Sequence, residues 1–204
     1  MMGLQNYYWL YKGLLPIETC KNIIAFCKNK RESQRGVTYH ESQDPKTKDH
    51  IRESDVRWIE DPWIYHEILP FVYDANEKAG WNFNIDWNES LQFTEYKTNQ
   101  YYGWHADNFN HPFGEKHHPN FRGKIRKISV TVSLSDSNDY EGGDFELDYR
   151  NSSKGTGNHI TTVTDAREQG SIIVFPSFVF HQVKPVTKGE RNSLVLWCLG
   201  PTWN

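Results

Sequence analysis

Three residues of types that bind metal ions, His105, Asp107 and His181, carry the most distinctive chemistry in the sequence. His105 and Asp107 lie two residues apart in YYGWHADNF, so in an extended segment both side chains project from the same face. His181 follows the apolar run IIVFPSFVF, where a strand would present its imidazole. An HxD triplet alone is weak support for a site, because short polar triplets arise by chance. Two imidazoles and one carboxylate on one face of a metal leave positions open, which is typical of non-haem Fe(II) centres that use O₂.

Arg191, ten residues after His181, is a fourth residue that could take part in the same site. It follows a Lys-Gly turn at the start of a returning strand, and a hairpin would bring it back toward His181. Its planar fork of N–H donors matches a carboxylate, such as the distal carboxylate of a dicarboxylic co-substrate. An isolated arginine near a turn would be solvated. The joint order of HxD, distant His and then Arg is the stronger signal, since each requirement lowers the chance expectation.

Three segments resemble the 2-oxoglutarate/Fe(II) oxygenases of the prolyl 4-hydroxylase and PKHD-type group. They are LQFTEYKTNQYYGWHAD, EGGDFEL and GSIIVFPSFVFHQVKPVTKGERNSLVLW, within residues 75–200. The resemblance implies that His105, Asp107 and His181 bind iron. It also implies that Arg191 holds the co-substrate and that Tyr96 hydrogen-bonds it.

The stretch around Tyr102 matches the family pattern with one departure. The frequent glycine before it is replaced by Asn99, a residue that also tolerates left-handed backbone, so the turn can survive. Tyr102 fits the tyrosine of that stretch, either as a ring packed between sheets or as a ligand contact. Gly142 and Gly143 would let the backbone turn sharply into a strand that lines the site in relatives.

The resemblance implies a dioxygenase that uses Fe(II), 2-oxoglutarate and O₂, with ascorbate as an optional reductant. It would hydroxylate a C–H bond of a prolyl residue in a protein or peptide and release succinate and CO₂. Hydroxylation of a free amino acid or small metabolite is an open alternative. A nucleic-acid demethylase fits poorly with a net charge of −3, and a non-catalytic cupin-like binding module that has lost its iron would not need the intact residue set.

The hydrophobic pattern predicts an α+β fold with a double-stranded β-helix (jelly roll) core backed by N-terminal helices. Apolar positions at helical spacing predict one helix over 17–27 and another from Pro62 to Lys78. From about residue 81 the chain consists of short β-rich segments separated by turns. We therefore expect a single domain over 1–204, with a helical part at about 14–80 and a jelly-roll core at about 81–200.

Two polar stretches are expected on the surface. Residues 28–57 are highly charged without an apolar period, which predicts a loop that is either disordered or a lid. Residues 108–124 form an irregular stretch that could also cover the site. This stretch carries His111, His117 and His118 without metal-ligand spacing, and the cations in and after it indicate a solvated face or a surface for an acidic protein.

Composition limits the remaining possibilities. The net charge of −3 and pI near 6.3 give no bulk attraction to nucleic acid or to an anionic membrane. Three cysteines without a CxxC motif suggest neither a disulfide framework nor a zinc site. The N-terminus lacks the pattern of an export signal, and the most apolar run, 171–180, is about half the length of a membrane span. We expect a cytoplasmic protein that binds neither nucleic acid nor a membrane; its oligomeric state is left open.

Overall fold

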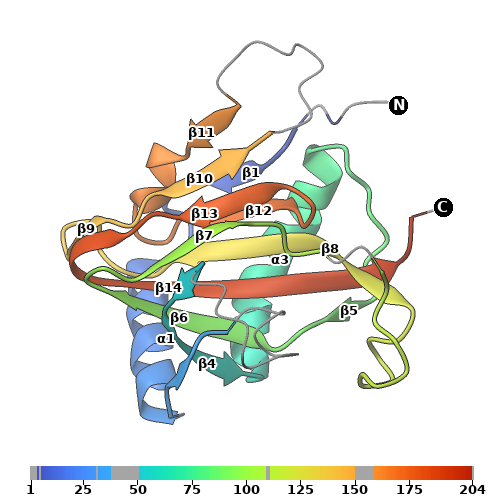
Figure 1. Cartoon of the computed structure of the whole chain (residues 1–204), viewed down its shortest axis with the longest axis horizontal. Coiled ribbons are helices and arrows are strands. Elements are labelled where there is room, and N and C mark those ends of the chain that lie inside the picture. Colours follow the sequence, from blue (N-terminus) through green and yellow to red (C-terminus); the bar gives the residue numbers. More distant parts are fainter. Residues whose placement is uncertain are drawn as a thin grey trace.

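Two antiparallel sheets that face each other form the frame of this computed structural model (Figure 1). The structure describes residues 4, 6–30, 32–37, 51–108, 111–149 and 159–203. Within these residues the larger sheet has nine strands and the smaller has five. Side chains of both sheets share one buried cluster, in which Phe175 of the large sheet packs with Phe145 and Val183 of the small sheet. Two facing sheets of this kind are consistent with the predicted jelly-roll core.

The large sheet has β14 at its centre, and this long strand pairs with β8 on one side and β6 on the other. The small sheet is built around β13, which lies between β10 and β7. In order across the large sheet, the strands are β1 (Trp9–Tyr11), β12 (Ile172–Pro176), β8 (Lys124–Ser133), β14 (Val186–Pro201), β6 (Leu91–Lys97), β4 (Asp55–Ile59) and β2 (Gln34–Arg35), with β5 (Trp87–Asn88) and β9 (Tyr140–Gly142) also paired to β14. In order across the small sheet, they are β11 (Ile160–Thr162), β10 (Phe145–Asp148), β13 (Phe180–Val183), β7 (Tyr101–His105) and β3 (Arg52–Glu53).

Two α-helices, α1 (Ile17–Lys30) and α3 (Pro62–Lys78), lie behind the large sheet in Figure 1. The span predicted for the second helix is confirmed residue for residue, with Pro62 in its first turn, where a missing N–H is harmless. Ile64, Ile68 and Val72 are fully buried along one side of α3. They belong to the same core cluster as the side chains of the large sheet that face the helices. A short 3-10 helix, η1 (Thr164–Arg167), precedes β12. Among the described residues, neither helix has the length and apolar character that a membrane span requires.

The prediction that 28–57 is a loop is wrong in part. β2, β3 and the start of β4 lie in this stretch and add edge strands to the two sheets. They left no apolar period because β2 and β3 are only two residues long and are held by main-chain pairing. Residues 38–50 lie outside the described residues, so the lid prediction for that part stays a prediction.

The two faces of the large sheet differ because side chains alternate along each strand. Leu91 and Phe93 of β6 point to the helices, and so do Leu194 and Leu196 of β14. The residues between them point toward the small sheet. On that inner face several buried side chains are polar, among them Gln92, Thr94, Ser129, Thr131, Arg191 and Ser193. The fold therefore places buried polar groups between the sheets.

Candidate active site

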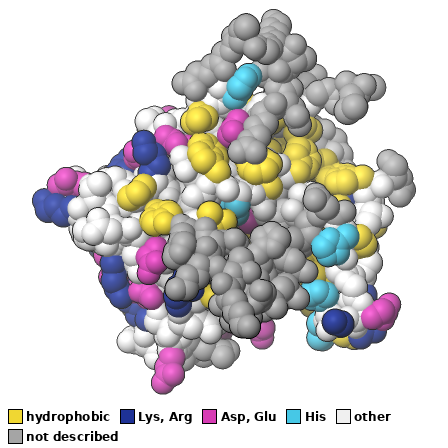
Figure 2. Space-filling view, viewed as in Figure 1, with side chains coloured by type: hydrophobic (Ala, Val, Ile, Leu, Met, Phe, Trp, Pro, Cys, Tyr) yellow, Lys and Arg dark blue, Asp and Glu magenta, His cyan; other side chains and the backbone are white. Residues whose placement is uncertain are grey.

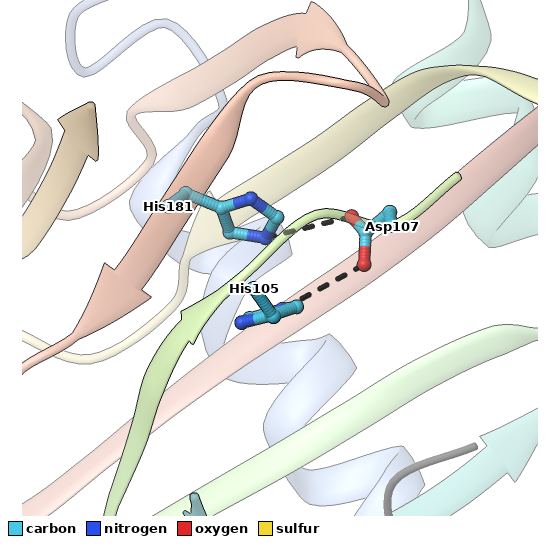
Figure 3. Close-up of side chains that lie close together, drawn as sticks. All are labelled: His105, Asp107 and His181. Carbon is cyan, nitrogen blue, oxygen red and sulfur yellow. Dashed lines mark ion pairs between the residues drawn. The ribbon is translucent and has the colours of Figure 1, made fainter. Parts of the chain in front are cut away.

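His105, Asp107 and His181 meet between the sheets, as Figure 3 shows. β7 ends at His105 and pairs with β13, so that His105 lies directly opposite His181. Asp107 follows immediately after β7, with its Oδ1 3.7 Å from His105 Nε2 and its Oδ2 3.5 Å from His181 Nε2. All three ligand atoms lie within 4.8 Å of one another. Among the described residues this is the one cluster of three such groups, and the remaining described histidines do not join it.

Main-chain carbonyls orient both imidazoles in the same way. His105 Nδ1 lies 2.8 Å from the carbonyl oxygen of Gly103, and His181 Nδ1 lies 3.0 Å from that of Val179. A carbonyl only accepts hydrogen bonds, so each Nδ1 carries the proton and donates it. Each Nε2 then directs its lone pair toward Asp107, which is the tautomer that a metal ligand requires.

Burial and neighbouring charges set the protonation of the cluster. Burial lowers the pKa of His105 to about 3, and repulsion from His181 acts in the same direction, so this imidazole is neutral at pH 7. Burial alone would raise the pKa of Asp107. Electrostatic interactions with His181, His105 and Arg126 and the hydrogen bond from Ser129 outweigh the effect of burial and lower that pKa to about 2. An ionised carboxylate beside imidazole nitrogens is a donor set that suits divalent iron.

Two serines hold Asp107 in place. Ser129 Oγ lies 2.7 Å from Asp107 Oδ2 and 2.9 Å from Ser177 Oγ. The ionised carboxylate accepts the Ser129 proton, and Ser177 can donate to Ser129 in turn. The carbonyl of Ser177 also accepts the backbone N–H groups of Asp107 at 2.9 Å and Asn108 at 3.0 Å. Asp107 is thus fixed at both its backbone and its side chain.

Arg126 and Glu89 form a buried ion pair next to Asp107, which the sequence alone did not reveal. Arg126 donates to both carboxylate oxygens of Glu89, at 2.5 and 2.7 Å, and its guanidinium lies 4.0 Å from the Trp197 ring centroid. The pair stabilises the negative carboxylate of Asp107 without occupying it. Glu89 and Arg126 are distant in sequence, so only the register of the strands brings them together.

The prediction of a solvated cationic face at this stretch is wrong in part, because Lys116 and Arg122 are exposed but the later cations are not. Besides Arg126, Lys124 pairs with Asp86 at 2.9 Å, and Lys127 is buried with its amine over the Trp203 ring. Neighbouring acidic and aromatic groups come from other segments, which the local pattern cannot show. Residues 111–123 form an irregular loop, and their role as a lid stays a prediction.

Arg191 lies between the sheets beside Tyr96. The two residues are directly paired in β14 and β6, and the guanidinium lies 5.5 Å from the centroid of the Tyr96 ring. The predicted hairpin is wrong, because β13 and β14 belong to different sheets and do not pair with each other. Arg191 is only 4% exposed, and its Nη1 has no hydrogen-bond partner among the described residues. Gly143, at φ +65°, allows this position, because a Cβ there would stand 3.0 Å from Arg191 Cδ. Asn99 also adopts the left-handed backbone predicted for it, with φ +70°.

Tyr102 stacks on His105, with ring centroids 3.6 Å apart and an interplanar angle of 12°. Its ring is packed and also lines the cavity around the metal ligands, so the structure combines features of both predicted readings. Burial raises the pKa of Tyr102 to about 12 and raises that of Tyr96 as well, so both phenols keep their protons at pH 7. The same cavity is lined by Gln92, Val130, Thr131, Phe145, Phe175, Val183, Ser193, Val195 and Trp197.

A two-sheet β fold with two histidines and an aspartate on one side of an enclosed cavity defines a class of mononuclear non-haem iron proteins. The family described as the 2OG-Fe(II) oxygenase superfamily matches residues 91–199, more than half of the chain, and the chain belongs to that superfamily. Fe(II) and 2-oxoglutarate are accordingly its metal and co-substrate.

Curated relatives are PKHD-type hydroxylases. One from Prochlorococcus marinus is 34% identical over 107 residues, which cover 52% of this chain and 40% of the relative. One from Alteromonas mediterranea is 34% identical over 106 residues, covering 52% of this chain and 41% of the relative. The prolyl 4-hydroxylase and PKHD-type group predicted from the sequence is confirmed. The chain spans less than half the length of these curated relatives.

Solved structures share the whole fold. A Pseudomonas putida prolyl-4-hydroxylase superimposes with a TM-score of 0.69 at 18% identity, covering 95% of this chain and 93% of that one. A viral collagen prolyl hydroxylase of Paramecium Bursaria Chlorella virus-1, in complex with 2-oxoglutarate, gives a TM-score of 0.67 at 18% identity, covering 96% and 97%. A Trichoplax adhaerens prolyl hydroxylase with a hypoxia inducible factor peptide fragment gives 0.66 at 17% identity, covering 95% and 84%.

Proposed function

We propose that this chain is an Fe(II)- and 2-oxoglutarate-dependent dioxygenase that hydroxylates a prolyl residue of a protein or peptide. The observation that carries the dioxygenase part is the convergence of His105, Asp107 and His181 beside a buried arginine, Arg191, that has an unused N–H donor. The resemblance to prolyl hydroxylases in fold supports the substrate class.

The metal would be held by the Nε2 atoms of His105 and His181 and by the carboxylate of Asp107. When bound, iron supplies the activation of O₂ and 2-oxoglutarate, so that a C–H bond is hydroxylated and succinate and CO₂ are released. The chain's own part is to keep both Nε2 lone pairs unprotonated and Asp107 ionised, through the contacts described above. Three preset ligands leave the opposite side of the metal for the reactants.

The co-substrate would be anchored by Arg191. A buried guanidinium with an unpartnered N–H is unfavourable by itself and becomes favourable when it donates to a carboxylate. The Tyr96 phenol stands beside it and, still protonated, can donate a second hydrogen bond to the same ligand. Together they would fix the far carboxylate and direct the 2-oxo acid end toward the metal.

A protein or peptide substrate is supported by the surface as well as by the fold. Figure 2 shows hydrophobic side chains in a band across the upper half of one face and charged side chains mainly toward its edges. Such an apolar area suits contact with another chain.

We also propose that 1–204 folds as one domain, with a helical part at about 14–80 and the core at about 81–200. The three cysteines are free and buried, which suits a reducing cytoplasm.

The test is an incubation of the chain with Fe(II), 2-oxoglutarate and a proline-rich peptide library, with the His105→Ala variant as control. We expect succinate release and one added oxygen on proline by mass spectrometry, both absent in the control. Efficient oxidation of free proline or another metabolite without any modified peptide would reject the substrate class but keep the dioxygenase. Absence of 2-oxoglutarate turnover with every substrate would reject the dioxygenase itself.

A further inference from the structure

Arg52 is a second buried arginine beside the metal site. It lies in β3, directly opposite Tyr102 of β7, and is 5% exposed. Its Nε donates to Ser54 Oγ at 2.9 Å, while its Nη2 is buried without a hydrogen-bond partner among the described residues. Like Arg191, it is a buried cation with an N–H donor that has no partner among these residues. Such a donor is a candidate for binding an anion.

Packing fixes the guanidinium of Arg52 on two sides. Its Cζ lies 4.6 Å from the centroid of the Tyr102 ring, and His105 stacks on the same ring at 3.6 Å, so one ring contacts both Arg52 and a metal ligand. On the other side lies Gly36, where a Cβ would stand 2.6 Å from Arg52 Nε and 2.5 Å from Ser54 Oγ. Gly36 is therefore required for space and not for backbone conformation. A stack leaves the edge of a guanidinium, where its N–H groups point, as the free part.

The charges of the site leave Arg52 unmatched. Divalent iron and a 2-oxoglutarate dianion cancel, as do Asp107 and Arg191, and Arg126 is paired with Glu89. Among the described residues, Arg52 has no carboxylate within ion-pair distance. A buried cation without a counter-ion is unfavourable until an anion binds.

We propose that Arg52 binds a carboxylate of the primary substrate, close to the residue that is oxidised. This inference rests on the proposed function and adds that the substrate is acidic. The carboxylate comes either from an Asp or Glu side chain next to the target or from the C-terminal carboxylate of the target itself. Both sources offer two oxygens in a plane, the geometry that a guanidinium edge accepts.

The test measures binding separately from turnover. The chain is loaded with Mn(II) and 2-oxoglutarate without O₂, and ligands are titrated in by calorimetry. One set of probes contains C-terminally amidated peptides that differ only in Asp, Asn or Lys beside a single proline. The other pair is N-acetylproline and N-acetylprolinamide. The proteins are wild type, Arg52→Gln, Arg52→Lys and Gly36→Ala, with Gly114→Ala as matched control because a Cβ there meets nothing within 4 Å.

We expect the wild type to bind the carboxylate member of one probe set roughly tenfold to a hundredfold more tightly than its neutral partner, as a charge-assisted hydrogen bond predicts. Arg52→Gln should bind both members equally, and Arg52→Lys should retain part of the preference. Gly36→Ala should weaken it by displacing the guanidinium, whereas Gly114→Ala should not. Affinities for Mn(II) and 2-oxoglutarate should stay close to wild type in all variants, which separates recognition from collapse of the site.

Equal wild-type affinity for acid and neutral probes in both sets would overturn the proposal, as would a preference that survives in Arg52→Gln. No measurable binding of any carboxylate probe would also overturn it. If Arg52→Gln does not fold, Gly36→Ala and Arg52→Lys decide the question by the same comparison. If carboxylate probes bind more tightly but no peptide is hydroxylated, the Arg52 site stands and the prolyl substrate is rejected. If peptides are hydroxylated equally well whatever their charge, the prolyl substrate stands and the Arg52 site is rejected.

Discussion

The two faces of the large sheet are built from alternate residues of the same strands, yet their composition is opposite. Toward the helices β8 presents Val130 and Val132, and toward the small sheet it presents Ser129 and Thr131. The outward face excludes water and stabilises the fold through apolar burial. The inward face buries polar groups, which stabilise a fold little by themselves. The side chains that stabilise the fold and those that face the site are thus separated by one residue along a strand.

Of the three buried side-chain atoms of β14 that lack a hydrogen-bond partner among the described residues, Asn192 Oδ1 lies on the helix side and two lie on the inward side. Arg191 Nη1 and Trp197 Nε1 are buried without hydrogen-bond partners, and both residues lie on the inward side of β14. Buried unsatisfied groups oppose folding, so a native protein keeps few of them, and mostly at functional sites. The inward face is therefore organised for a ligand, and substitutions on the two faces should affect different observables.

The largest expected effect is the loss of turnover on removing a metal ligand. His105→Ala, Asp107→Ala and His181→Ala should each abolish 2-oxoglutarate-dependent succinate release, because no other described residue is placed to replace the lost donor. Thermal unfolding of the metal-free variants should remain cooperative. Substantial activity in any one of them would remove that residue from the ligand set.

Arg191→Ala should act on the co-substrate alone. Losing one partner of a buried charge pair corresponds to about 2 to 5 kcal/mol, so the half-saturating 2-oxoglutarate concentration should rise by a factor of roughly tens to thousands. Metal affinity should stay unchanged, since a guanidinium is not a metal ligand. Lys188→Ala, an exposed position on the same strand, β14, is the control. An unchanged half-saturating concentration would show that the co-substrate binds elsewhere.

On the outward face, Ile68→Ala should affect stability and spare the chemistry. Ile68 is fully buried between α3 and the sheet, and a cavity there should lower the free energy of unfolding by about 2 to 5 kcal/mol. At a temperature where the variant is folded, its half-saturating 2-oxoglutarate concentration should equal that of wild type. Chemical denaturation and the succinate assay measure the two effects. A large change in the half-saturating 2-oxoglutarate concentration would show that the outward face also affects the chemistry.

Ser129→Ala should have the smallest of these effects. It removes the hydroxyl that donates to Asp107 Oδ2 at 2.7 Å, and loss of such a support typically lowers metal affinity about tenfold to a hundredfold. Ser133→Ala is matched in type, strand and face, but the Ser133 hydroxyl donates to the Ala166 carbonyl instead. Calorimetry with Mn(II) should therefore distinguish the two variants. Equal affinities would mean that Ser129 does not position Asp107.

Local patterns in the sequence predicted what local interactions determine. The apolar spacing defined α3, and the tolerance of Asn99 for left-handed backbone was confirmed at φ +70°. The HxD spacing and the later histidine identified three side chains that the structure does bring together, although their roles stay predictions. Arg191 lies beside Tyr96, which lines the same cavity. The resemblance to a known family supplied the cofactors, which the residues alone suggested only in part.

Pairings across strands could not be predicted. The Glu89–Arg126 pair depends on the register of strands distant in sequence, and each residue alone resembles an ordinary surface charge. Arg52 stood in a charged stretch that indicated a loop, and its burial follows from the pairing of a two-residue strand with β7. Contacts of this kind require the tertiary arrangement, because the free energy that fixes them comes from long-range packing.

The metal centre is tested most directly by a calorimetric titration of the metal-free chain with Mn(II). The titration compares wild type with His105→Ala, Asp107→Ala and His181→Ala, and His118→Ala is the control. We expect one ion bound per chain in wild type and in His118→Ala, and strongly weakened or undetectable binding in each of the other three variants. Wild-type affinity and stoichiometry in any of those three variants would contradict a metal centre built from these residues on the inward side of the sheet.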